Sequence, residues 1–273
     1  MRPVAGPTTT TPFERDTAVE RLGEGRWRAT CSERWFAPRG PNGGYLAAIV
    51  LRAAAGELAE TGQERPARSL TLHYLRPPAA GELEVVVAVE RAGRRLTTVS
   101  VRVEQAGRLC VLGVGAFSDD FESVADYAEP APGAEPPVEL FQPPEGGPMP
   151  PIASRFRMAP AVGPTPLSGA DEARTGGWIA FAEGAQELDA PALAMLTDAW
   201  VPAPFTRLRE PVGAPTVDLT IHFRSPDAVA GEPVLAVFSS RFSHGGFFEE
   251  DGEIWSADGR LLAQSRQLAL LVS

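Results

Sequence analysis

Hydrophobic and polar residues alternate along several short stretches of the chain, as in strands that bury one face. In the first half this pattern predicts strands over 70–77, 83–91, 96–105 and 109–117. In the second half it predicts strands over 219–226, 234–242, 247–255 and 261–272. The turn Asp258-Gly259 separates two alternating runs, which is typical of a β-hairpin. Each half therefore contains an antiparallel meander.

The two halves resemble each other in sequence. Residues 70–77 read LTLHYLRP, and residues 219–226, which lie 149 positions later, read LTIHFRSP. Proline, which cannot donate to a sheet ladder, ends both segments. The strands and turns that follow also match in order, which indicates an internal repeat.

Each half also contains one predicted helix before its meander. The first helix spans Gly43 to about Leu58, with Asn42 as its N-cap. The second spans Ala190 to about Val201, with Asp189 as its N-cap and a proline in the first turn. Both helices are apolar on nearly every side, so we expect them to be buried. A curved antiparallel sheet wrapped around one central helix in each half satisfies this pattern.

Composition divides the chain into four parts. Residues 1–12 are rich in threonine and proline and are predicted to form a flexible tail. Residues 119–152 are rich in proline and acidic residues and are predicted to form a partly extended linker. The remaining segments, 13–118 and 153–273, are the two predicted domains.

Charge and residue usage exclude several functions. The net charge of −10 disfavours nucleic-acid binding, which requires a basic face. All basic residues are arginine, so Schiff-base chemistry and a phosphate-binding P-loop are excluded. No apolar run is long enough to span a membrane. The cysteines, Cys31 and Cys110, are too few for a disulfide framework, so we expect a cytoplasmic protein. No Cys-x-x-Cys or His-x-x-x-His pattern occurs, and we expect neither a metal nor another cofactor.

The repeat and its motifs resemble the double-hotdog acyl-CoA thioesterase II (TesB-like) family. The segments that carry the resemblance are PNGGYL (41–46), LHYLRP (72–77), LTDAW (196–200), TVDLTIHF (216–223) and DGRLLAQSRQ (258–267). The resemblance covers about residues 13–118 and 153–273. It implies an α+β fold of two tandem hotdog domains whose sheets join side by side. It also implies a thioesterase that acts on acyl-CoA, and a homo-oligomer.

Comparing the halves isolates three polar residues in the second one. Aligning the helix caps places Asp198 opposite Leu51, whereas the strand offsets place Thr216 opposite Ala67 and Gln267 opposite Gly115. An acid in an apolar helix must be paired, hydrogen-bonded or protonated, unless it reaches solvent near the helix end. From the residues alone, the alternative for Thr216 is an ordinary strand threonine, and the alternative for Gln267 is an exposed strand position.

The resemblance implies catalytic roles for these three residues. Asp198 would act as the general base for a water molecule that Thr216 and Gln267 hold in line with the thioester carbonyl. Gly43 and Gly44, at a helix N-terminus, are candidate backbone donors to the oxyanion, although close helix–sheet packing explains them equally well. Because CoA carries phosphates, an arginine patch is also expected; the candidates are Arg76, Arg94 and Arg95.

The sequence leaves two alternative functions open. The chain could be a non-catalytic protein that binds acyl-CoA or acyl chains. It could also be a hotdog hydratase or dehydratase, but residues 42–44 offer no histidine for that chemistry. His73 and His222 occupy equivalent places in the repeats, and we expect them to pack or bond at the interface between the halves. No Gly-x-Ser-x-Gly elbow occurs, which disfavours a serine hydrolase.

Overall fold

One antiparallel sheet runs through both halves of the computed structural model, which describes residues 10–137, 139–224 and 230–272. In the first half the elements are α1 (Pro12–Asp16), β1 (Val19–Gly23), β2 (Arg26–Cys31), η1 (Glu33–Trp35), β3 (Phe36–Ala37), β4 (Gly40–Pro41), α2 (Gly43–Glu60), β5 (Ala67–Tyr74), β6 (Gly81–Ala92), β7 (Thr97–Gln105) and β8 (Arg108–Phe117). In the second half they are η2 (Pro151–Arg155), β9 (Phe156–Val162), β10 (Arg174–Phe181), α3 (Ala190–Leu196), η3 (Ala203–Thr206), β11 (Thr216–Phe223), β12 (Val234–Ser239), β13 (Ser243–His244), β14 (Phe247–Trp255) and β15 (Leu261–Leu270).

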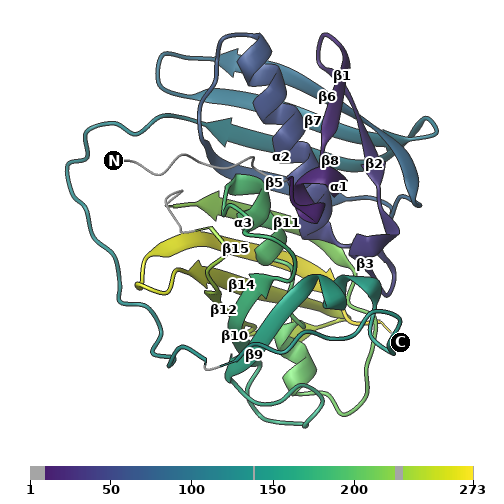
Figure 1. Cartoon of the computed structure of the whole chain (residues 1–273), viewed down its shortest axis with the longest axis vertical. Helices are drawn as coiled ribbons and strands as arrows, with labels where there is room; N and C mark the ends of the chain where they lie inside the picture. The colour runs from purple at the N-terminus through teal and green to yellow at the C-terminus, as the bar shows by residue number, and fades with distance from the viewer. Residues whose placement is uncertain (1–9, 138, 225–229, 273) are drawn as a thin grey trace.

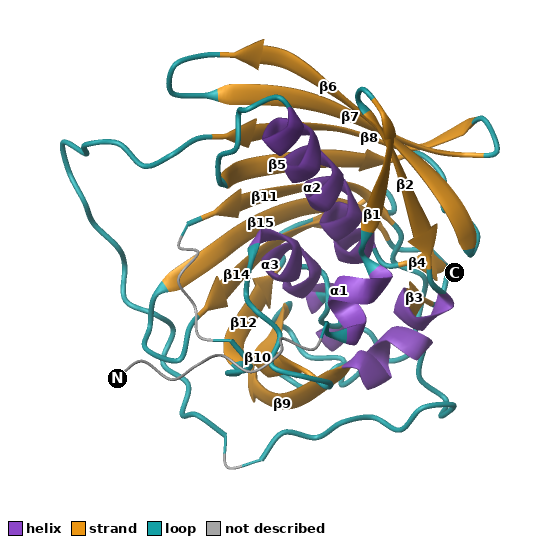
Figure 2. Ribbon diagram, turned by 45° about the horizontal axis from the view of Figure 1, so that its top comes forward, coloured by secondary structure: helices purple, strands orange, loops and turns teal. Residues whose placement is uncertain are grey.

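The two halves join through β5 and β11. The strand order is β1-β2-β6-β7-β8-β5-β11-β15-β14-β12-β10-β9, so the strands of one half follow those of the other without a break. Across the junction Leu72 lies opposite Leu219, and the hydroxyls of Thr71 and Thr220 are 3.0 Å apart. The expectation that the two sheets continue into one is confirmed. The sheet curves around α2 and α3, which lie together on its concave side (Figure 2).

The two central helices differ in length. Helix α2 starts as predicted, because Asn42 Oδ1 accepts the N–H of Tyr45 at 3.0 Å, and it runs to Glu60. Helix α3 also starts as predicted after Asp189 but ends at Leu196, so the predicted end near Val201 is wrong. The hydroxyl of Thr197 donates to the carbonyl of Ala194, and a turn follows in place of further helix. The structure thus puts Asp198 in a turn beyond the helix.

The strand registers confirm the alignment of the repeats. A β-bulge lies between Ala67 and Ser69 in β5 and at the equivalent place in β11, between Thr216 and Asp218. In the first half Gly115 lies opposite both Leu70 and Val99. In the second half Gln267 lies opposite Leu219 and Glu250. Thr216 therefore corresponds to Ala67, Gln267 to Gly115, and Glu250 to Val99.

The predicted linker covers the outer face of the second half. Its residues Ala131, Ala134 and Leu140 pack against an apolar cluster formed by Trp178, Leu235, Val237 and Trp255. The indole N–H of Trp178 donates to the carbonyl of Glu135 at 2.9 Å. Figure 1 shows the described residues of 119–150 running without helix or strand along the side of the molecule, up to the start of η2.

At the other end of the chain, residues 1–9 of the predicted tail lie outside the described residues. Thr11 caps α1, where its hydroxyl accepts the N–H of Glu14, and Pro12 is the first residue of that helix. The end of the predicted tail is therefore part of the packed structure. None of the helices in the described parts of the chain combines the length and apolar character needed to cross a bilayer.

Candidate active site

The N-terminus of α2 meets the turn after α3 at one end of the central strands. β11 begins at this end, because Asp218 lies opposite His73 near the end of β5. The hydroxyl of Tyr74 donates to the carbonyl of Gly43 at 2.8 Å and so fixes the helix terminus against β5. Residues from both halves therefore meet here.

Asp198 is held against the first turn of α2. Its Oδ2 accepts the side-chain N–H of Asn42 at 2.9 Å and the backbone N–H of Gly44 at 3.1 Å. Asn42 Nδ2 also donates to the backbone carbonyl of Asp198 at 2.7 Å. The positive end of a helix dipole stabilises a carboxylate in this position. The N–H of Gly43 also acts on this carboxyl group, and within the described residues no hydrogen bond to the second oxygen, Oδ1, accompanies those to Oδ2.

The Asp198 carboxyl group has an unusual affinity for protons. Burial raises its pKa from 3.8 to about 6, although the N–H groups of Gly44, Gly43 and Asn42 oppose that rise. A carboxylate with a pKa just below neutral pH is ionised under physiological conditions and still basic enough to accept a proton. This combination suits a general base.

A second hydrogen-bonded chain runs across β11, β15 and β14. The hydroxyl of Thr216 donates to Gln267 Oε1 at 2.8 Å, and Gln267 Nε2 donates to Glu250 Oε1 at 2.7 Å. Glu250 Oε2 accepts the backbone N–H of Ala203 in η3. Gln267 and Glu250 are both buried. The structure thus brings Thr216 and Gln267 into direct contact, and Gln267 is not at an exposed position.

Glu250 connects this chain electrostatically with Asp198. Desolvation raises the pKa of Glu250 from 4.5 to about 7, and the negative charge of Asp198 contributes to the rise. The two carboxyl groups therefore lie within electrostatic reach of each other. Helix α3 contacts both β11 and β15, so Asp198, in the turn after α3, lies on the same side of the sheet as Thr216, Gln267 and Glu250.

Sequence reasoning missed Glu250. It lies in the acidic run Glu249-Glu250-Asp251, which resembles a solvated strand face. The strand registers supply the missing signal, because they make Glu250 equivalent to the fully buried Val99 of the first half. Asn42 was recognised as a helix cap, but its second role as a donor to Asp198 required the structure.

The two glycines at the start of α2 allow a close approach of backbone and side chains. A Cβ added to Gly44 would lie 2.6 Å from the carbonyl oxygen of Ala194, and one added to Gly43 would lie 3.0 Å from Asp198 Oδ2. Helix α3 therefore packs directly on α2 at Gly44. The Gly44 N–H, considered above as a donor to an oxyanion, donates to Asp198 in this structure.

The candidate arginines are separated along the sheet. Arg76 follows the Tyr74 end of β5 and is exposed, near the site. Arg94 and Arg95 lie in the turn between β6 and β7, and the Arg95 guanidinium lies 5.2 Å from the ring centre of Phe121. That turn is at the Ala67 end of β5, because Thr97 and Ala67 both pair with Phe117. The length of β5, roughly 23 Å, separates them from the Tyr74 end.

The histidines and cysteines lie away from these contacts. His73 and His222 are on the strands that join the halves, opposite Asp218 and Ser69, and both are exposed. Cys31 and Cys110 are buried, and burial raises the pKa of both thiols, that of Cys31 to about 12. No cluster of three or more metal-ligating side chains occurs among the described residues.

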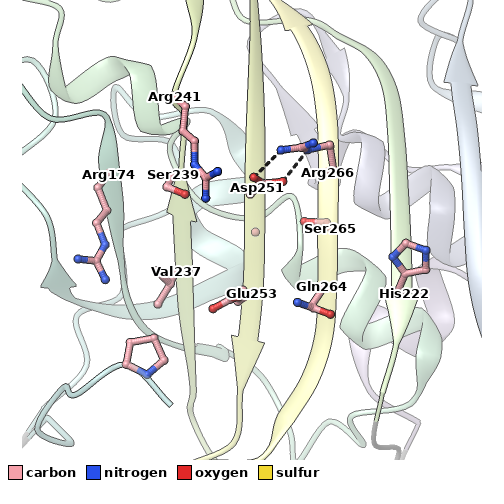
Figure 3. Close-up of a pocket in the computed structure, with 12 residues that line it drawn as sticks. Arg174, His222, Val237, Ser239, Arg241, Asp251, Glu253, Gln264, Ser265 and Arg266 are labelled. Carbon is pink, nitrogen blue, oxygen red and sulfur yellow. Dashed lines mark hydrogen bonds and ion pairs between the residues drawn. The ribbon is translucent and has the colours of Figure 1, made fainter. Parts of the chain in front are cut away.

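An open groove of about 590 Å³ lies on the opposite face of the sheet from the contacts of Asp198. Figure 3 shows its lining, with Arg174 and Arg241 on one side, His222 on the other, and an ion pair between Asp251 and Arg266 in between. Glu250 and Gln267 point to the concave side, whereas their strand neighbours Asp251 and Arg266 line this groove. None of the predicted site residues lines it.

Comparisons with known proteins agree with this architecture. The chain is 28% identical to a protein of known structure from Thermobifida fusca YX that is assigned as a thioesterase II; the match covers 98% of this chain and 99% of that one, with a TM-score of 0.84. A hot dog fold protein of unknown function from Alicyclobacillus acidocaldarius has the same fold, with 24% identity, a TM-score of 0.87 and coverage of 97% and 99%. An uncharacterized protein of Mycobacterium tuberculosis (strain ATCC 25618 / H37Rv) is 27% identical over 261 residues, 88% of this chain and 89% of the relative.

Two family models match almost the whole described chain. The model of the acyl-CoA thioesterase N-terminal domain matches residues 31–118, and that of the C-terminal domain matches residues 125–271. Together with the structural neighbours they show the double hotdog fold that the resemblance implied. The chain therefore belongs to the TesB-like acyl-CoA thioesterase family.

Proposed function

We propose that this protein hydrolyses acyl-CoA thioesters to a carboxylic acid and CoA, with Asp198 as the general base. The observation that carries the proposal is the partly buried Asp198 carboxyl, held by the start of α2, with a pKa of about 6 and, within the described residues, no hydrogen bond to its second oxygen, Oδ1. Membership in a thioesterase family supports the reaction class.

The reaction needs a water molecule between Asp198 and the thioester carbonyl. Asp198 Oδ1 accepts a proton from the water as its oxygen bonds to the carbonyl carbon. The tetrahedral intermediate collapses, the carbon–sulfur bond breaks, and the CoA thiolate takes the proton back from Asp198. Thr216 and Gln267 orient the water, and the N-terminal end of α2 favours the negative charge that develops beside it.

Exposed arginines near this end of the molecule are suited to bind the phosphates of CoA. Arg76 follows β5 directly, and Arg39 lies in the adjoining turn between β3 and β4. The two turns pack together, since a Cβ added to Gly40 would lie 2.8 Å from Pro77 Cβ. We propose Arg76 and Arg39 for this role, because guanidinium groups match phosphate geometry. Arg94 and Arg95 lie at the other end of β5, which favours Arg76.

The test is the release of free thiol from a panel of acyl-CoAs by the wild-type protein and by Asp198→Asn. We expect the variant to lose activity by roughly 10²- to 10⁴-fold, the usual contribution of a general base. Asp126→Asn, the same substitution in the exposed linker, is the matched control and should keep full activity. Equal turnover by wild type and Asp198→Asn contradicts the role of Asp198. A wild-type protein that binds acyl-CoA but releases no thiol is instead the non-catalytic binding protein considered above.

A further inference from the structure

Glu250 is a buried carboxyl group that the mechanism above does not use. Its side chain points to the concave side of β14 and is only 4% exposed. The equivalent residue in the first half is Val99, so the fold itself can be built with an apolar side chain here. Burying a carboxylate is unfavourable unless its oxygens are bonded. In this structure both oxygens of Glu250 accept hydrogen bonds.

We propose that Glu250 is a positioning residue for hydrolysis: it fixes the orientation of the Gln267 amide and, through it, the direction in which the Thr216 hydroxyl donates. This inference rests on the proposed thioesterase function. It assigns to Glu250 a part in the reaction that the alignment of the repeats did not reveal.

The hydrogen-bonding capacity of each group fixes the directions of these bonds. A carboxylate only accepts, whereas an amide side chain has one donor end and one acceptor end. Glu250 Oε1 therefore accepts a hydrogen bond from Gln267 Nε2 at 2.7 Å. This bond turns Gln267 Oε1 towards Thr216, whose hydroxyl donates to it at 2.8 Å. The Thr216 hydroxyl has a single proton, and it must donate that proton to Gln267.

The direction of this bond matters for a water nucleophile. With its proton engaged, Thr216 Oγ1 presents lone pairs and can accept a hydrogen from the water, which leaves the lone pair on the water oxygen free to attack. If the amide were reversed, Thr216 would accept from Gln267 and would donate to the water. That donation would engage one of the two lone pairs of the water oxygen and make the water a weaker nucleophile.

The surroundings of Glu250 make its charge state part of this mechanism. The groups that face it are the Ala203 N–H from η3, the Gln267 amide from β15 and, at longer range, Asp198 from the turn after α3; Glu249 is its neighbour on β14. Burial and the charge of Asp198 raise its pKa to about 7. Protonation turns one oxygen into a donor and permits the reversed amide, so activity should fall as the pH falls through this range.

The first test compares Glu250→Gln with Glu253→Gln, the same substitution on the same strand but on the opposite face. An amide at position 250 has only one oxygen, so it cannot accept from both the Ala203 N–H and the Gln267 amide on separate oxygens. It therefore favours the arrangement in which the Gln267 amide is reversed. We expect kcat to fall by roughly 10- to 100-fold with KM changed by less than about threefold. The acid limb of the pH profile should also move down from about 7 towards about 6, where Asp198 alone titrates. The Glu253→Gln control should match wild type.

A second variant keeps the test decisive if Glu250→Gln does not fold. Gln267→Glu alone places two carboxyl groups against each other and should be slow. Adding Glu250→Gln to it restores one carboxylate and one amide, with Thr216 again a donor, and should recover kcat by about tenfold or more. A double variant that folds but remains as slow as Gln267→Glu contradicts the proposal.

Wild-type kinetics provide a measurement that needs no variant. If both carboxylates must be ionised, log kcat should fall with a limiting slope of about two on the acid side. A slope of one, or an active Glu250→Gln variant with wild-type kcat and pH profile, overturns the role of Glu250 and leaves the thioesterase proposal standing. A wild-type protein without thioesterase activity overturns the proposed function itself.

Discussion

Asp198→Asn should stabilise the protein at neutral pH while it removes the general base. Asp198 Oδ2 alone accepts the bonds from Asn42 and Gly44, so the carbonyl oxygen of an asparagine can keep both of them. The substitution removes only the charge, whose burial raises the pKa of Asp198 from 3.8 to about 6. This difference corresponds to about 3 kcal/mol. Because the side chain is partly exposed, we expect a gain of about 1.5–3 kcal/mol.

The sign of the effect follows from proton linkage. Between pH 3.8 and about 6 the folded protein binds the Asp198 proton more tightly than the unfolded chain does. The contribution of Asp198 to the free energy of unfolding of the wild-type protein therefore falls as the pH rises through that interval, and it is constant above it. The advantage of Asp198→Asn should be full above about pH 6 and should vanish below the unfolded pKa.

Thermal and urea unfolding of wild type and Asp198→Asn between pH 3.5 and 8 measure this effect. At pH 7.5 the Tm of the variant should exceed that of wild type by roughly 3–5 °C, and near pH 3.5 the two should coincide. Asp126→Asn, in the exposed linker, should stay within about 0.5 kcal/mol of wild type throughout. A variant that is less stable than wild type at pH 7.5, by an amount independent of pH, would refute the reasoning.

Two further predictions concern packing. Gly44→Ala should lower the free energy of unfolding by about 1–3 kcal/mol, because its Cβ would lie 2.6 Å from the Ala194 carbonyl oxygen. The control Gly133→Ala, whose Cβ would meet nothing within 4 Å, should leave the free energy of unfolding unchanged. Equal urea midpoints for wild type and Gly44→Ala would show that α2 and α3 do not touch at Gly44. Cys31 and Cys110 should resist an aromatic disulfide reagent in the native protein and react only after denaturation, because both thiols are buried with raised pKa values; rapid labelling of either thiol in the native protein would contradict this burial.

The alternating pattern predicted the strands of the two meanders, including the largely buried β12, but missed β1, β2, β9 and β10. Strands β5 to β8 follow the alternation closely. In contrast, β10 is buried along nearly its whole length, because the linker residues Ala131 and Ala134 pack on its outer side. A strand buried on both faces has no period of two to detect. The covering segment itself was read from its prolines as a linker, since its few apolar residues show no period.

The sequence likewise predicted some residues of the candidate site and missed others. Asp198, Thr216 and Gln267 could be singled out because the first repeat shows what the fold needs at those places. Glu250 differs from its counterpart Val99 just as clearly, but recognising this requires the strand register across β14 and β15. Sequence spacing alone did not supply that register. The donors to Asp198 were also hidden, because they come from the other half of the chain.

The position of Asp198 depends on where α3 ends as much as on the acid itself. If α3 were as long as α2, residue 198 would lie inside a helix, where Leu51 lies in the first repeat. Because α3 ends at Leu196, the turn that follows carries Asp198 to the N-terminus of α2, where Asn42 and Gly44 donate to it. The first half thus supplies the helix terminus and the second half supplies the acid. The hydrogen bonds to the Asp198 carboxyl therefore require both halves of the chain.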